Sequence, residues 1–271
     1  MTKRTLFHLA LALTVFYCTG PLLWQLITSL KPDQELTRLP PLLPGRPTLT
    51  QYTTLFREHP FGRIILNSAI IASSTTILSV ALGSSCAFAL AKLRVRGSAL
   101  ILGLVLSISM FPPIATVSPL YLIIRFLGLR DTLWALIITY TTFSLPFSIW
   151  ILTSFFREIP DEIYLAARAD GCTPFQAYTR IMLPLALPGL FTTAILVFIF
   201  SWNEFLFALT FTATPASRTI PAAIALFPGL HEVPWGEIAA ASVVVTIPLL
   251  LLVFLFQRRI VEGLSAGAIK G

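Results

Sequence analysis

The chain has 271 residues, of which 56% are hydrophobic and only 11% are charged, and its mean hydropathy is +0.83. An average soluble domain carries about 25% charged residues, so a water-soluble globule of this size would lack the polar side chains to cover its surface. The composition therefore indicates a membrane protein. It argues against a nucleic-acid-binding domain, a disordered chain or a secreted disulfide scaffold, despite a net charge of +7. The three cysteines match no metal or redox spacing.

Six segments are long and apolar enough to cross a bilayer as helices, which requires about 20 mostly apolar residues. They are residues 6–30, 64–91, 99–124, 132–156, 185–209 and 237–257. The first follows Lys3 and Arg4 as a secretion signal would, but its length and the lack of a clear cleavage site predict a retained span. The predicted fold is all-α, with one polytopic transmembrane domain over residues 1–271.

The short basic clusters at 92–96 and 258–259 orient these spans, because Lys and Arg in short loops stay on the cytoplasmic side. Both termini are therefore predicted to be cytoplasmic. Residues 31–63 and 210–236 become extracytoplasmic loops, the first with one short helix near 51–58, and residues 158–184 and 258–271 become cytoplasmic. Prolines inside the spans, as at Pro112, Pro113 and Pro146, favour a transporter, because broken helices are tolerated beside protein or a water-filled path.

The cytoplasmic segment that follows residue 158 is too polar to span and carries helix start and stop signals. Asp161 and Glu162 suit a first helical turn, and Gly171 suits a C-terminal stop. Thr173, Pro174 and Gln176 then form the pattern of a new N-cap with a capping box. The pattern predicts two short helices that meet at a glycine turn. By pattern alone, an ordinary structured loop is an equal alternative.

This segment resembles the EAA loop of ABC importer permeases. The residues in register are Ala166, Ala167, Asp170, Gly171, Ile181, Leu183, Pro184 and Pro188, with Tyr178 where the family usually has Phe. Leu165 stands in place of the family's Glu, and Cys172 in place of a common Ala. Segments 202–212, 219–227 and 258–271 are similar to the MalG-type subunit of carbohydrate ABC importers, so the resemblance covers essentially the whole chain.

The resemblance implies the type I ABC importer permease fold and an inner-membrane complex. The expected partners are a homologous second permease, two ATPase subunits and an extracytoplasmic solute-binding protein, with no nucleic acid. The expected cargo is a small carbohydrate such as a disaccharide, a glucoside or a polyol. The residues implied in ATPase coupling are Leu165, Ala166, Ala167, Asp170, Gly171, Cys172, Pro174 and Tyr178. Tail contacts to the ATPase are expected at Gly267, Ile269 and Lys270; a frayed terminus is the alternative.

The sequence contains no phosphate-binding loop of the G-x-x-x-x-G-K-[ST] pattern. The chain is therefore not expected to be an enzyme, and no catalytic residue, metal or cofactor is assigned to it. ATP and Mg²⁺ are expected on the partner ATPase subunits.

A solute path for a sugar should combine uncharged polar groups and aromatic rings at membrane depth. The candidates are Tyr140, Thr141, Phe143, Trp202, Asn203 and Glu204, with Ser107 and Ser109 as weaker ones. An ionisable residue within a span is a functional suspect, although a plain interfacial or interhelical role is an equal alternative for Glu204.

Two other classes of function compete with this interpretation. A secondary transporter or channel that works without an ATPase should show internal repeats and buried titratable coupling residues, and neither is evident. An intramembrane enzyme should show a metal motif or a nucleophile beside a base, and the spans contain neither pattern.

Overall fold

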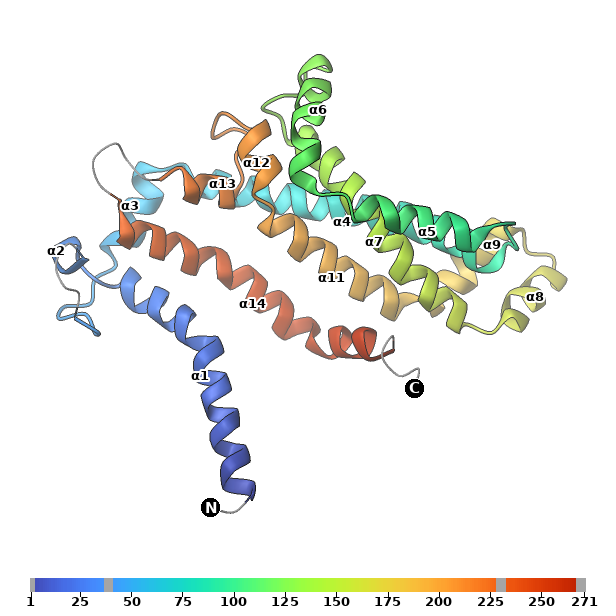
Figure 1. Cartoon of the computed structure of the whole chain (residues 1–271), viewed down its shortest axis with the longest axis horizontal. Helices are drawn as coiled ribbons and strands as arrows, with labels where there is room; N and C mark the ends of the chain where they lie inside the picture. Colours follow the sequence, from blue (N-terminus) through green and yellow to red (C-terminus); the bar gives the residue numbers. More distant parts are fainter. Residues whose placement is uncertain (1–2, 37–40, 228–232, 267–271) are drawn as a thin grey trace. The chain divides into compact units, whose positions relative to one another are not determined.

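The structure is a computed structural model that describes the backbone of residues 3–36, 41–227 and 233–266, and the side chains of residues 4–257 within those ranges. Its described residues form helices and connecting loops, without a strand (Figure 1). The chain divides into two compact units, Met1–Arg63 with Ala223–Leu250, and Ile64–Ala222 with Leu251–Gly271. The expectation of a single domain stays a prediction.

The first unit contains α1 (Lys3–Ser29), α2 (Asp33–Leu36), α3 (Thr50–Glu58) and the first half of α14 (Trp235–Ala266). Helix α3 confirms the short helix predicted near 51–58. The buried Lys31 holds the segment after α1, because its Nζ donates to the Pro41 carbonyl at 2.6 Å and lies 4.6 Å from the centre of the Trp24 ring. In the same unit, His59 Nε2 lies 3.1 Å from Glu237 Oε2.

The second unit contains most of α4 (Phe61–Lys92), then α5 (Ser98–Ser109), α6 (Pro113–Phe126), α7 (Leu133–Glu158), α8 (Asp161–Ala169) and α9 (Pro174–Ala177). The rest of the unit is the π-helix η1 (Tyr178–Met182), α10 (Leu183–Leu185), α11 (Leu187–Asn203), α12 (Leu206–Phe211), the start of α13 (Ile220–Ala225) and the second half of α14. Helix α7 is the most buried candidate span and contacts α5, α11 and α12. Helix α4 packs against α7, where Gly83 lies close to Ser148.

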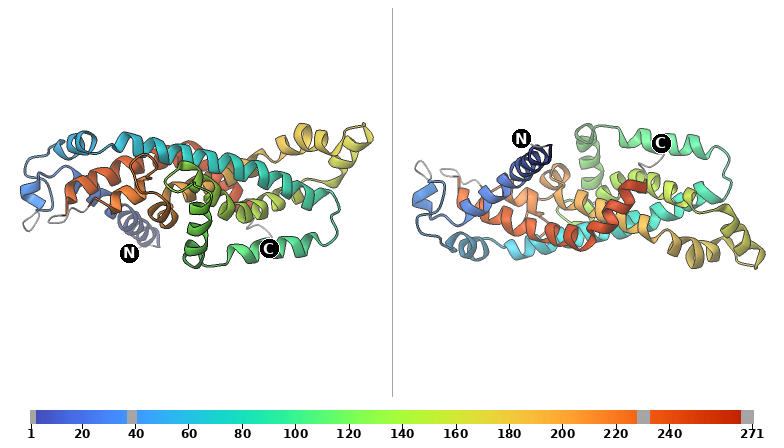
Figure 2. Two further views of the ribbon diagram at one scale, coloured as in Figure 1. Left: turned by 90° about the horizontal axis from the view of Figure 1, so that it is seen from above. Right: turned by 90° about the horizontal axis from the view of Figure 1, so that it is seen from below.

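Within the described residues, four helices are long and apolar enough to cross a membrane unbroken, and six crossings result if two bent pairs each count as one. The segment predicted as one span over 99–124 is instead two helices, α5 and α6, that meet at 88° (Figure 2). The break coincides with Pro112 and Pro113. Each of these lacks an amide donor, and the residue before a proline is pushed out of the helical region, so the helix must stop and restart there.

The segment predicted as one span over 185–209 is also interrupted. Helix α11 ends at Asn203, and Glu204 takes an extended conformation before α12 begins. The Glu204 carboxylate then accepts hydrogen bonds from the amides of Phe207 and Ala208 at 2.9 and 3.1 Å, which satisfies two donors at the start of α12. Glu204 therefore has a structural role within the chain, because its carboxylate caps the start of α12.

Candidate functional site

Helix α8 ends in a tight glycine turn. The amide of Cys172 donates to the Ala167 carbonyl at 3.0 Å, and the amide of Gly171 donates to the Arg168 carbonyl at 3.2 Å. This pair of bonds is the Schellman motif, which needs a left-handed residue after the helix. Gly171 supplies it with a φ of +87°. The predicted glycine stop is therefore confirmed.

Helix α9 starts with the predicted capping box. The Thr173 hydroxyl accepts from the Gln176 amide at 3.2 Å, and the Gln176 side chain accepts from the Thr173 amide at 2.8 Å. Pro174 occupies the first turn, where its missing amide costs nothing. Residues 161–177, named here the α8–α9 hairpin, project from the end of the second unit at which α7 ends (Figure 1).

The motif residues of the α8–α9 hairpin and η1 divide into an exposed set and a buried set. The exposed set comprises Leu165, Ala166, Asp170, Gly171 and Pro174; Cys172 is half-buried, and Ala167 and Tyr178 are buried. Leu165 is 52% exposed and Phe175 is 71% exposed. Ile163 is also exposed, at 36%, so the hairpin presents three large apolar side chains on its surface.

The buried residues attach the α8–α9 hairpin to the membrane helices. Tyr178 packs in a cluster with Phe88 of α4 and Phe156 of α7, with Phe88 and Tyr178 ring centres 5.1 Å apart. Its hydroxyl lies 2.8 Å from the Ser84 hydroxyl of α4. Sequence reasoning assigned Tyr178 to ATPase coupling, and the structure places its side chain on the inner side of the hairpin.

Lys92 is a second attachment point, and sequence reasoning used it only to orient the chain. Its side chain is 2% exposed, and its Nζ donates to the Ile159 carbonyl and to Asp161 Oδ1, both at 2.5 Å. The hydrogen bond and charge of Lys92 lower the pKa of the Asp161 carboxyl below its ordinary value. The sequence held a signal for this contact. A lysine ends one apolar span, and acidic residues begin a later helix on the same predicted side of the membrane.

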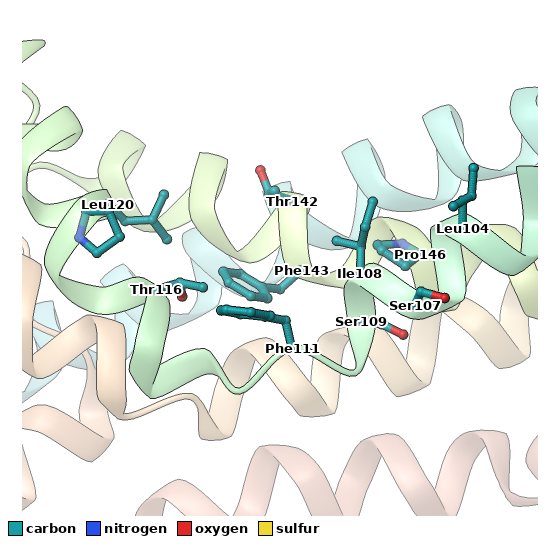
Figure 3. Close-up of a pocket in the computed structure, with 11 residues that line it drawn as sticks. Leu104, Ser107, Ile108, Ser109, Phe111, Thr116, Leu120, Thr142, Phe143 and Pro146 are labelled. Atoms are coloured by element: carbon teal, nitrogen blue, oxygen red, sulfur yellow. The ribbon is translucent and has the colours of Figure 1, made fainter.

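A pocket of about 720 Å³ lies where the α5–α6 break faces α7 (Figure 3). Its lining is mostly apolar, with hydroxyls from Ser107, Ser109, Thr116 and Thr142. Phe111 of the break and Phe143 of α7 both line it (Figure 3). A neighbouring pocket of about 420 Å³ also includes Phe143 and Ser109, together with Ser144 and residues of α11.

Of the six candidates for the solute path, Phe143 alone lines either of these two pockets. Tyr140 and Thr141 are buried in α7, and Trp202 is buried with its ring stacked on Phe198. The Tyr140 hydroxyl lacks a hydrogen bond of good geometry among the described residues, although it interacts electrostatically with the Glu204 carboxylate.

The remaining candidates are placed as follows. The exposed Asn203 donates to the Ile199 carbonyl of its own helix at 2.8 Å. Ser107 and Ser109, which the sequence ranked lower, line the larger pocket, as does Phe111, which sequence reasoning missed. The tail positions Gly267, Ile269 and Lys270 lie outside the described residues.

Comparison with known proteins identifies the family of this chain. The family described as "binding-protein-dependent transport system inner membrane component" matches residues 79–265. The chain belongs to this family. As a member of it, the chain is a multi-pass membrane protein, and the assignment to the MalG-type permeases of sugar ABC importers is confirmed.

Two relatives of this permease are similar over nearly their whole length. The chain is 47% identical to the trehalose transport system permease protein SugB of Mycobacterium tuberculosis over 261 residues, covering 96% of this chain and 95% of that one. It is 42% identical to the trehalose/maltose transport system permease protein MalG of Thermococcus litoralis, and the match covers 99% of this chain and 98% of that one.

A solved structure shares the fold of this permease. A chain in the crystal structure of a bacterial ABC transporter involved in the import of the acidic polysaccharide alginate matches with a TM-score of 0.80. The identity is 20%, and the match covers 94% of this permease and 95% of that chain. The all-α importer-permease fold predicted from the sequence is therefore confirmed.

Proposed function

We propose that the chain is the permease subunit of an ATP-driven importer for a small carbohydrate, in which it forms half of the translocation path. The observation that carries the proposal is the α8–α9 hairpin. It presents exposed Leu165 and Phe175 outside the membrane helices, while Tyr178 and Lys92 connect it to α4. An exposed apolar surface on a hairpin attached to a membrane helix is suited to a docking partner.

The partner on this surface is an ATPase subunit. Uphill import requires an energy-yielding cycle that favours different conformations of the path, because only differential interaction shifts a conformational equilibrium. The chain carries no phosphate-binding loop, so ATP and Mg²⁺ bind on two partner ATPase subunits. Their closure on ATP displaces the docked hairpin and turns the membrane helices as rigid bodies.

The cargo is a disaccharide of the trehalose or maltose kind. The two relatives named above transport these sugars according to their names. The larger pocket fits such a cargo chemically, because the rings of Phe111 and Phe143 offer flat apolar faces and Ser109, Thr116 and Thr142 offer hydroxyls. A pyranose presents both an apolar face and hydroxyl groups, and binding sites combine apolar lining with a few polar groups.

The family and the unburied helices support the remaining partners of the proposal. A solute-binding protein delivers the sugar on the extracytoplasmic side, and a homologous permease completes the path. The apolar helix α5 has no buried residue within this chain, which supports contact with that second permease and with lipid. Both termini and the α8–α9 hairpin lie on the cytoplasmic side, as the short basic clusters indicate.

The test is to express the chain with its second permease and ATPase, purify it in detergent by a tag on this chain, and reconstitute it with the binding protein in liposomes. We expect an ATPase to co-purify and [¹⁴C]trehalose or [¹⁴C]maltose to enter only with ATP inside. The control is a complex whose ATPase has lost its catalytic glutamate. Uptake that persists in that control and follows an ion gradient would instead establish the secondary transporter.

A further inference from the structure

Helix α4 is attached to the α8–α9 hairpin by polar contacts on both sides of the joint between α7 and α8. Helix α7 ends at Glu158, and the extended Ile159 and Pro160 connect it to α8. Lys92 Nζ donates to the Ile159 carbonyl before the proline and to the Asp161 carboxylate after it, each at 2.5 Å. The joint is thereby bridged by a side chain from α4.

The ion pair between Lys92 and Asp161 is buried at the lysine and exposed at the aspartate. The Lys92 side chain is 2% exposed, whereas the Asp161 side chain is 74% exposed. A buried ammonium that loses a hydrogen-bond partner is strongly disfavoured. The ammonium of Lys92 therefore resists any hinge motion that would separate Ile159 and Asp161 from the end of α4.

A second polar contact lies directly after the hairpin, at the first residue of η1. The Tyr178 hydroxyl is 2.8 Å from the Ser84 hydroxyl and 3.4 Å from the Ser85 hydroxyl, both on α4. Phe88, one turn further along α4, contacts the rings of Tyr164 and Tyr178. Apolar ring packing allows sliding, whereas a buried hydrogen bond has a preferred length and direction, so the hydroxyl pair fixes where the hairpin sits on α4.

The opposite end of α4 is bonded to a different loop. The Asn67 side-chain amide donates to the carbonyls of Pro215 and Arg218 at 3.2 and 3.0 Å. The Ser68 hydroxyl accepts from the amide of Ile220 at 3.0 Å. Asn67 and Lys92 are about 37 Å apart along the helix axis at about 1.5 Å per residue, so α4 connects the hairpin to the loop before α13 across the thickness of a membrane.

We propose that Lys92 and Ser84 are positioning residues that make α4 and the α8–α9 hairpin move as one rigid piece. This rests on the proposed function, in which an ATPase displaces the hairpin. The displacement then reaches the loop of residues 213–219 through α4, instead of being absorbed at the joint between α7 and α8. Two packed elements transmit motion only when their contact has no alternative arrangement of similar energy, and the buried lysine and the hydroxyl pair provide that restriction.

The test measures the distance between spin labels on the two elements in the complete importer in lipid nanodiscs. In a background without native cysteines, labels are attached at the exposed positions Glu162 of α8 and Ile77 of α4 by Glu162→Cys and Ile77→Cys. Pulsed electron spin resonance then records the distance without nucleotide and after trapping with ATP and vanadate. We expect one narrow distance that is the same in both states.

The informative variants are Tyr178→Phe combined with Lys92→Met, which keep the ring and the aliphatic stem. We expect their distance distribution to broaden and to shift when nucleotide is trapped. Matched controls are Tyr164→Phe, in the same aromatic cluster, and Arg157→Met, at the exposed end of α7; both should behave like the parent.

Two results overturn this proposal alone: a parent distance that changes with nucleotide, or variants that keep the narrow unchanged distance. A chain that purifies without an ATPase overturns the proposed function and the proposal with it.

Discussion

The carboxylate of Asp131 accepts a hydrogen bond from the backbone amide of Ala213 at 2.8 Å, although the two residues are 82 positions apart. It also accepts from the amide and hydroxyl of Thr214 at 3.0 and 2.7 Å, and from the hydroxyl of Ser217. Asp131 itself has a φ of 62° in the turn between α6 and α7. One side chain therefore fastens the loop of residues 213–219 to that turn.

These bonds make the stability of the loop depend on pH. Partial burial acts to raise the pKa of Asp131, but the hydrogen bonds from Ser217, Ala213 and Thr214 outweigh it and hold the pKa well below its ordinary value. Because the folded pKa lies below the unfolded one, the stabilisation is present above about pH 4 and is lost as the pH falls further. We expect Asp131→Asn to cost about 1 kcal/mol at pH 7, after allowance for solvent exposure.

The measurement is the apparent unfolding temperature in detergent at pH 7 and pH 3.5. The parent should lose more stability between these two values than Asp131→Asn does. Asp33→Asn, in the first unit, serves as a comparison for a general effect of acid. If the parent and Asp131→Asn lost equal stability between pH 7 and pH 3.5, the pH dependence could not be assigned to Asp131.

Gly171 is required for its backbone conformation and not for lack of space. A Cβ placed there would meet no atom within 4 Å, yet φ is +87°. A β-branched residue in this left-handed region costs about 1–2 kcal/mol or more. We predict that Gly171→Val removes the stimulation of ATP hydrolysis by the sugar-loaded binding protein while membrane insertion stays intact.

The control for this prediction is Gly171→Asn, because Asn enters the left-handed region more readily than other residues. It should retain most of the stimulated ATP hydrolysis. If valine and asparagine behaved alike, the turn conformation would not be what coupling requires.

Phe175 is the most exposed large apolar residue of the α8–α9 hairpin. If its ring fills a pocket on the ATPase, Phe175→Ser should lower the amount of ATPase that co-purifies, by tenfold or more if the loss is about 1.5–3 kcal/mol. Phe175→Leu preserves most of the apolar area and should retain the ATPase. The amount is read from the ratio of the two subunits on a stained gel, and equal ratios in the parent and Phe175→Ser would exclude Phe175 from the interface.

Asn67 reports on the end of α4 that is remote from the hairpin. Replacing it by alanine removes two hydrogen bonds to the loop of residues 213–219, each worth about 0.5–1.5 kcal/mol. We expect Asn67→Ala to leave basal ATP hydrolysis unchanged and to reduce its stimulation by the loaded binding protein about fivefold. Thr76→Ala, which removes a hydroxyl bonded only within α4, should leave both rates at the parent values.

Phe111 and Phe143 test whether the larger pocket contacts the sugar. Stacking of a ring face on an aromatic side chain is directional, so Phe143→Leu should raise the KM for sugar-dependent ATP hydrolysis more than Thr142→Val does. The buried Tyr140 provides the comparison, because Tyr140→Phe removes a hydroxyl that lies in neither pocket. If Tyr140→Phe raised the KM more than Phe143→Leu did, the result would favour the solute path predicted from the sequence, which includes Tyr140.

Much of this protein was determined by local sequence. The apolar runs indicated where the chain can cross a bilayer, because a backbone in lipid must satisfy its own hydrogen bonds, but two of the six predicted spans are interrupted. The α8–α9 hairpin was equally local: the signals at Gly171 and Thr173 act through neighbours within a few residues, and the structure shows the glycine turn and the capping box where they were predicted. The proline pair at 112–113 marked a break, but the 88° angle there joins a helix that packs on α7 to one that packs on α12.

The partners of buried polar groups were decided only by the tertiary structure. Tyr140 and Glu204 carried the composition of a solute site, yet one is buried in α7 and the other caps α12. In the sequence, Lys92 marked only a basic cluster and no pattern singled out Asp131, yet each bonds to groups more than 60 residues away. The period of a helix shows which residues share a face, but the atom opposite a side chain is supplied by another helix, and only the packed fold brings the two together.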